Sequence, residues 1–226
     1  MRLPDALQST DDTVPLGYLN QYYHSTVGTR KRFTGAEFDG WDSTGTRAVD
    51  ANRFTADDLI AITFLSVQVR AVQAIQILQD AEGVLSGLLA DLGPDRDLVD
   101  EGEPLSSDFP GWKLIAELRK LDHIGATTAS KLVARKRPQL RPIYDSVVAA
   151  VTESTKGLWE PLRLELRKDN KALRRRLLTL KAQADLPAEV SALRVVDVIA
   201  WMEGQTPAWA KMVANLARDE PPVADG

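Results

Sequence analysis

The chain has 226 residues, of which 44% are hydrophobic and 27% charged, and its 28 Lys and Arg against 32 Asp and Glu give a net charge of -4. This length suffices for one sizeable core or two small ones. The acidic balance argues against a protein that coats nucleic acid through overall basicity. The absence of cysteine excludes disulfides, thiol chemistry and Cys-ligated zinc or iron–sulfur clusters.

The charge is unevenly distributed along the chain. Residues 112–181 hold 17 Lys or Arg and 7 Asp or Glu, a local net charge of +10, so the remainder carries -14. The basic segment therefore suits an anionic partner. No apolar run approaches the roughly 20 residues that span a membrane, and the N-terminus lacks a signal-peptide core. We expect a cytoplasmic protein with no membrane partner, and the sequence leaves its oligomeric state open.

Hydrophobic residues recur with helical period through most of the chain, and strand-like alternation is scarce. The first half predicts a short amphipathic helix over 16–25 and an irregular or hairpin region over 28–54. A long helix is expected from Thr55, as N-cap, to about residue 78, with Asp58 completing a capping box. The acidic stretch 91–108 is predicted to be a solvated linker.

The second half of the chain is also expected to be helical. Six helices are predicted, over residues 112–121, 127–137, from about 145, 158–184, 188–202 and 207–217. The fold class is therefore all-α, as a single domain or two closely packed lobes. We divide it into an N-terminal helix with an aromatic and glycine-containing loop (1–54), a helical core (55–150), and a charged helix with C-terminal helices packed on that core (151–226).

The most informative stretch predicts two helices joined by a tight turn that contains Gly125. Thr127 and Thr128 lie in the first turn of the second helix. Free backbone N–H groups and the helix dipole at such a position attract a phosphate. Four bases of the second helix add Coulombic attraction. They are Lys131, Arg135, Lys136 and Arg137. This pattern predicts a phosphate-binding site that does not read the base sequence.

The same stretch resembles the helix-hairpin-helix motif of the DNA glycosylase superfamily that includes endonuclease III and the adenine glycosylases. Residues 121–129, LDHIGATTA, are similar to the LPGVGxxTA hairpin of that family. Tyr144 and Asp145 lie in a segment similar to its apolar-Asp segment, with Asp145 18 residues beyond Thr127. Upstream, residues 65–69, LSVQV, resemble the family's LSxQx segment. The resemblance implies a glycosylase-like helical fold whose partner is duplex or damaged DNA.

The resemblance also implies roles for individual residues. Asp145 would be the catalytic carboxylate of N-glycosidic bond hydrolysis, and Gln68 would fill the gap left by an extruded nucleotide. Thr127 occupies the position of the Schiff-base lysine of lyase members, so the enzyme would be monofunctional, with no metal or cofactor. His123 replaces a hairpin glycine and would contact the phosphate; histidine tolerates a left-handed backbone better than most residues.

Each of these residues also has a structural interpretation. Asp145 suits the N-cap of the helix that follows it, Gln68 suits a solvent-facing polar position, and any tight turn between helices would use Gly125. Asp197 is expected to form an ion pair with Arg194, one helical turn before it.

Two further sets of residues have alternative interpretations. The first consists of Lys168, Lys171 and Arg175, which share one face of a continuous helix. That face is either solvated or a second phosphate-binding patch. The second set is the aromatic residues of the N-terminal region, which either stack on a base or fill a core. They are Phe33, Phe38, Trp41 and Phe54.

Three functions remain open from the sequence. The first is a DNA-binding protein with monofunctional glycosylase activity. The second is a non-catalytic nucleic-acid or partner-binding module built on the same core. The third is an interaction protein whose basic segment pairs with its own acidic remainder. Residues 32–36 and 191–202 resemble an uncharacterised actinobacterial family of unknown function, which favours none of the three.

Overall fold

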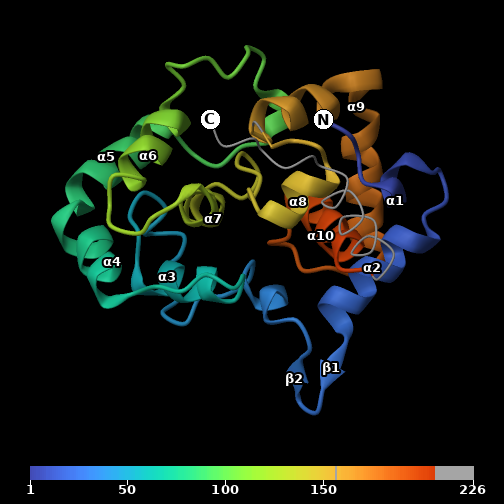
Figure 1. Cartoon of the computed structure of the whole chain (residues 1–226), viewed down its shortest axis with the longest axis horizontal. Helices are drawn as coiled ribbons and strands as arrows, with labels where there is room; N and C mark the ends of the chain where they lie inside the picture. Colours follow the sequence, from blue (N-terminus) through green and yellow to red (C-terminus); the bar gives the residue numbers. More distant parts are fainter. Residues whose placement is uncertain (156, 207–226) are drawn as a thin grey trace, which may run out of the picture.

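The computed structural model describes residues 1–155 and 157–206, and within them the chain is mostly helical, as predicted (Figure 1). The predicted helix 207–217 lies outside the described residues. The helices are α1 (Asp5–Gln8), α2 (Thr13–His24), α3 (Ala56–Thr63), α4 (Ala71–Ile75), α5 (Glu82–Leu92), α6 (Pro110–Leu118), α7 (Ala126–Lys136), α8 (Ser146–Val151), α9 (Trp159–Gln183) and α10 (Ala192–Gly204). None of these described helices is long and apolar enough to cross a membrane.

Shorter elements complete the fold. They are the strands β1 (Thr26–Val27) and β2 (Arg30–Lys31), the 3-10 helices η1 (Thr34–Glu37) and η3 (Leu98–Asp100), and the π-helix η2 (Gln76–Asp80). The two strands form an antiparallel hairpin, which confirms the irregular or hairpin region predicted over 28–54. Gly28 makes its turn with a φ of 61°, a value that glycine adopts without strain. Figure 1 shows this hairpin projecting beyond the helical body.

The long helix predicted from Thr55 to about residue 78 is correct at its start, but it is interrupted after residue 63 and resumes only at residue 71 as α4 and η2. The Thr55 N–H donates to the Asp58 carboxylate at 2.9 Å, as the capping box requires. The helix ends because Ser66 has a φ of 61° and the Leu65 carbonyl accepts a hydrogen bond from Lys131 Nζ at 2.8 Å. A tertiary contact thus overrides the helical periodicity.

The highly charged helix predicted over 158–184 matches the bounds of α9 but is interrupted in its middle. Lys168 has an extended ψ of 155°, and Asp169, Asn170 and Lys171 all have positive φ. The side chains of Lys168, Lys171 and Arg175 therefore do not share the face of one continuous helix, so that prediction is wrong. Each of the three binds within the protein, through Glu165, Asp100 and the Asn170 carbonyl, respectively.

The acidic stretch 91–108 is exposed over much of its length, as its composition predicts, but it is not a free linker. Leu98 and Val99 are buried against the core, and the adjacent carboxylates pair with α9. Asp97 binds Arg174 at 2.5 Å, and Asp100 binds Lys171 at 2.7 Å. The acids of this stretch therefore neutralise part of the basic segment.

The core is continuous across the three regions expected from the sequence. Helix α10 is buried along most of its length and packs against α2, α8 and α9, while α3 packs on α7 and α5 on α6. Figure 1 shows α7 end-on near the centre of the view, with α3 below it and α8 and α10 beside it. Helix α7 therefore lies between the helices α3 to α6 on one side and the helices α8 and α10 on the other.

The C-terminal turn of α7 is held by a buried ion-pair cluster. Asp58 accepts from Arg135 Nε at 3.3 Å and pairs with Lys136 Nζ at 2.5 Å. Arg137 donates to the carbonyls of Ala51 and Leu89 at 2.8 Å each. All four charged side chains are buried. Burial lowers the pKa of Lys136 below its ordinary value, and the charge of Asp58 opposes that shift.

We expect Asp58→Ala to lower the free energy of unfolding by about 3–5 kcal/mol, because it leaves two buried cations without their carboxylate. Asp100→Ala is the control: it breaks an exposed pair with Lys171 and should cost at most about 1 kcal/mol. Urea unfolding followed by circular dichroism measures both. Equal losses for the two variants would contradict the role assigned to Asp58.

Candidate functional site

A cavity of about 200 Å³ lies between the base of the hairpin, the turn after α3, α7 and α10. Its aromatic lining residues are Tyr22, Phe33, Phe64 and Trp201. Its charged lining residues are Arg32, Lys131, Asp145, Arg194 and Asp197. Drug-sized ligands occupy pockets of roughly 300–1,000 Å³. The cavity is therefore suited to a single small ring system.

The aromatic wall is ordered by ring–ring and cation–ring contacts. The Tyr22 and Phe33 rings stack at 5.4 Å with 9° between their planes, and Trp201 lies edge-on to both at 5.9 Å. The Arg32 guanidinium lies 5.7 Å from the Phe33 ring centroid, and that of Arg194 lies 5.3 Å from the Tyr22 centroid. Such contacts hold the rings in place and present flat surfaces to a planar ligand.

Asp145 is both an N-cap and a cavity residue. One carboxylate oxygen accepts the Val147 N–H at 3.0 Å, which confirms the predicted cap of α8. The other oxygen accepts from Lys131 Nζ at 3.2 Å. The Tyr144 N–H donates to Ser130 Oγ at 2.9 Å, which joins this segment to α7. The carboxylate of Asp145 therefore has a fixed orientation at the cavity wall.

A second carboxylate in the cavity was not recognised as a site residue from the sequence. Asp197 pairs with Arg194, as predicted, but both side chains also line the cavity. Arg194 further binds Asp39 at 3.2 Å and Tyr22 Oη at 2.8 Å. Burial raises the pKa of Asp197 to about 6, against the opposing charge of Arg194. The sequence signal that could have identified Asp197 is its position as an isolated acidic residue on an otherwise apolar helix.

The turn between α6 and α7 is exposed and partly as predicted. His123 adopts the left-handed backbone with a φ of 57°, and its carbonyl accepts from Gln73 Nε2 at 3.0 Å. Gly125 is the N-cap of α7 with a φ of -83°, and a Cβ there would meet nothing within 4 Å. The turn therefore does not require glycine at 125. Thr127 and Thr128 lie half-buried in the first turn of α7, as expected.

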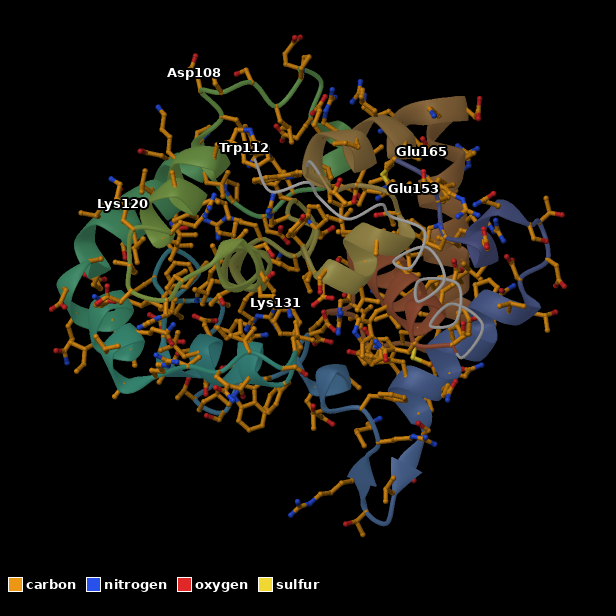
Figure 2. The ribbon with its side chains drawn as sticks, viewed as in Figure 1. Asp108, Trp112, Lys120, Lys131, Glu153 and Glu165 are labelled. Atoms are coloured by element: carbon orange, nitrogen blue, oxygen red, sulfur yellow. The ribbon has the colours of Figure 1, made fainter. Side chains whose placement is uncertain are left out.

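The bases predicted to surround this turn point elsewhere. Lys131 is buried and lines the cavity; Figure 2 shows it near the centre of the view, while Lys120 lies at the edge. Arg135, Lys136 and Arg137 are at most 6% exposed and bind Asp58 and backbone carbonyls. The prediction that these three bind DNA phosphates is therefore wrong, because their hydrogen-bonding groups are used inside the fold.

The remaining predicted residues occupy distinct environments. Gln68 is exposed in the non-helical stretch between α3 and α4, two residues beyond Ser66 at the cavity. Tyr144 is half-buried, and its hydroxyl donates to the Thr155 carbonyl at 3.2 Å. Of the N-terminal aromatic residues, Phe38 and Phe54 are core, whereas Phe33 lines the cavity. Within the described part of the chain, no group of three or more His, Asp or Glu side chains is placed to hold a metal.

The fold and the cavity define a helical protein with two carboxylates and three cations in one aromatic-lined recess. The family model that matches residues 15–204 is that of DUF6308, a family of unknown function, and the chain belongs to this family. No curated protein and no solved structure matches the sequence. The matched range includes every residue that lines the cavity.

We expect Gly35→Ala to disturb the cavity, because a Cβ at this position would lie 2.0 Å from Tyr22 Oη and 3.0 Å from Leu65 Cδ2. The displacement should lower the free energy of unfolding by about 1–3 kcal/mol. Gly40→Ala is the matched control, since a Cβ there meets nothing within 4 Å. Unfolding in urea measures both, and an unchanged Gly35→Ala stability would contradict the close approach.

The raised pKa of Asp197 predicts a pH-dependent stability. Because the folded pKa of about 6 exceeds the unfolded value of 3.8, the folded state holds this proton more tightly and loses stability as pH rises. From pH 4.5 to 7, the free energy of unfolding of the wild type should fall by about 2 kcal/mol relative to Asp197→Asn. Parallel pH dependences of the two proteins in urea unfolding would show that Asp197 is ionised throughout.

Proposed function

We propose that the protein is a DNA-binding helix-hairpin-helix protein that hydrolyses the N-glycosidic bond of a nucleotide whose base enters the cavity. The observation that carries this proposal is the position of Asp145. Its carboxylate is held at the wall of a ring-sized, aromatic-lined recess by Lys131 and the Val147 N–H. The DNA glycosylase resemblance places the catalytic carboxylate at the same residue.

The chemistry requires stabilisation of positive charge on the sugar. As the bond to the base breaks, the sugar acquires oxocarbenium character, which a fixed carboxylate stabilises electrostatically. Asp145 is the residue for this role, and it can also orient the attacking water. The departing base gains electron density and needs a proton, for which Asp197 is the available donor, because its pKa of about 6 keeps part of it protonated near neutral pH.

Two exposed features support a nucleic-acid substrate. The turn between α6 and α7 leaves His123 and Gly125 exposed at the start of α7, where a phosphate would meet backbone N–H groups. Gln68 is exposed on the turn that also supplies Ser66 to the cavity. A side chain in that position can occupy the space of a nucleotide rotated into the recess.

A second function is favoured because many cations of the basic segment form ion pairs with acidic residues of the same chain. Asp58, Asp97, Asp100 and Asp12 each pair with a base from α7 or α9. This pairing agrees with the alternative in which the positive segment neutralises the protein's own acids. In that case the protein is an interaction protein in which the turn between α6 and α7 only connects two helices and does not bind DNA.

Single-turnover base release from duplexes with damaged bases distinguishes the two functions. We expect Asp145→Asn to reduce the rate of base release by about 100-fold or more, while the dissociation constant for a duplex with an abasic-site analogue changes less than about threefold. Asp108→Asn is the control, because Asp108 lies exposed at the periphery (Figure 2). Duplex binding without base release by the wild type would support a non-catalytic nucleic-acid-binding module, whereas no duplex binding at low salt would support the interaction protein.

A further inference from the structure

The hairpin beside the cavity carries a run of three exposed cations. Arg30 and Lys31 form β2, and Arg32 follows directly. Both strands are exposed, and Val27 on β1 is 68% exposed. A two-stranded hairpin is at best marginally stable in water without a partner. Lys31 Nζ links this hairpin to α2 by donating to the Tyr23 carbonyl at 2.6 Å.

These cations differ from those of α7 and α9. Every Lys and Arg in those two helices has a hydrogen-bond or ion-pair partner within the protein, the long-range pair Arg174–Asp97 among them. Arg30 has no such partner among residues 1–155 and 157–206, and Arg32 has only the Phe33 ring. No carboxylate in the described part of the chain forms an ion pair with the hairpin. Its positive charge is therefore available to an external anion.

The backbone directs two of the cations to one side. The antiparallel pairing of Thr26 with Lys31 continues to Arg32, whose N–H donates to the Ser25 carbonyl at 2.9 Å. Successive residues of such a ladder point to opposite faces, so Arg30 and Arg32 share a face while Lys31 turns back toward α2. Alternate residues lie about 6.7 Å apart along a strand. On this shared face, Arg30 lies next to the turn of the hairpin and Arg32 lies at the cavity.

We infer that the hairpin 26–32 is a DNA-binding arm, on which Arg30 and Arg32 bind the phosphates of the strand that flanks the nucleotide in the cavity. The inference rests on the proposed function, because it takes DNA as the anion. Arginine suits this role because its guanidinium binds a phosphate through two hydrogen bonds. The arm replaces the phosphate contacts that the buried bases of α7 cannot make.

The test is fluorescence anisotropy of a labelled duplex with an abasic-site analogue, titrated at several salt concentrations. Arg30→Gln/Arg32→Gln should weaken binding at least tenfold at low salt and reduce the slope of log K against log salt by about 2, since each phosphate contact contributes about 0.9. Arg30→Lys/Arg32→Lys should retain most of that slope, because the charges remain. Circular dichroism should show unchanged folding, since both side chains are exposed.

The matched control is Arg2→Gln/Lys168→Gln, which removes the same charge from the half-exposed Arg2 near the N-terminus and the exposed Lys168 in α9, on the opposite side of the molecule from the hairpin (Figure 1). It should bind as the wild type does. Loss of binding in this control, with the hairpin variant unaffected, would assign the contact to α9 and overturn the inference. Equal binding by all variants would also overturn it, while leaving the proposed function intact.

Two further outcomes separate this inference from the proposed function. Hairpin-dependent binding without base release would support the DNA-binding arm and contradict the hydrolytic activity. A wild-type protein that does not bind the duplex at low salt would overturn both. Vesicles with 30% phosphatidylserine are titrated in parallel, and binding to these vesicles but not to the duplex would assign the arm to an anionic membrane surface and overturn the inference.

Discussion

The burial of charge on α7 is the constraint on which the rest of the structure depends. Arg135 and Lys136 are buried beside Asp58, which pairs with both, and Asp58 is fixed by the capping box at the start of α3. One turn earlier in α7, Lys131 donates a hydrogen bond to the Leu65 carbonyl just after the end of α3, and it donates a second to the Asp145 carboxylate, which it orients. A single helix thus fixes the loop before α3, the turn after it and the cavity wall. Loss of any buried partner would leave an uncompensated charge in the interior.

This constraint also explains which parts of the fold were predictable. Local signals identified the ends of helices correctly, as at the Thr55 cap and the Asp145 cap, because capping involves neighbours in sequence. The same signals did not predict the end of α3, which requires a hydrogen bond from a lysine 66 residues away. The interruption of α9 at residues 168–171 was likewise missed, although its overall bounds were predicted. Periodicity records which face is apolar but not where the backbone leaves the helix.

The sequence predicted the carboxylate of the candidate site but not the set of residues that lines the cavity around it. The motif spacing singled out Asp145, and the structure places that residue at a cavity. The bases beside the motif were interpreted as a surface because charge runs are normally solvated, whereas here they pair with acids distant in sequence. Tyr22, Arg194, Asp197 and Trp201 come from the two ends of the chain, so no local pattern connects them to Asp145. Arg30 and Arg32 on the hairpin, which form no ion pair among the described residues, lie outside the basic segment.

The cavity is built from segments that lie far apart in the sequence. Residues 55–150 supply Asp145, Lys131 and the turn after α3 with Phe64, but Tyr22, Phe33 and Trp201 come from α2, the hairpin base and α10. The central segment alone would present half a recess with one side open to solvent. The site therefore belongs to the whole chain and cannot be transplanted as a module. Any protein that shares this recess must preserve the contact between α2 and α10 as strictly as the carboxylate itself.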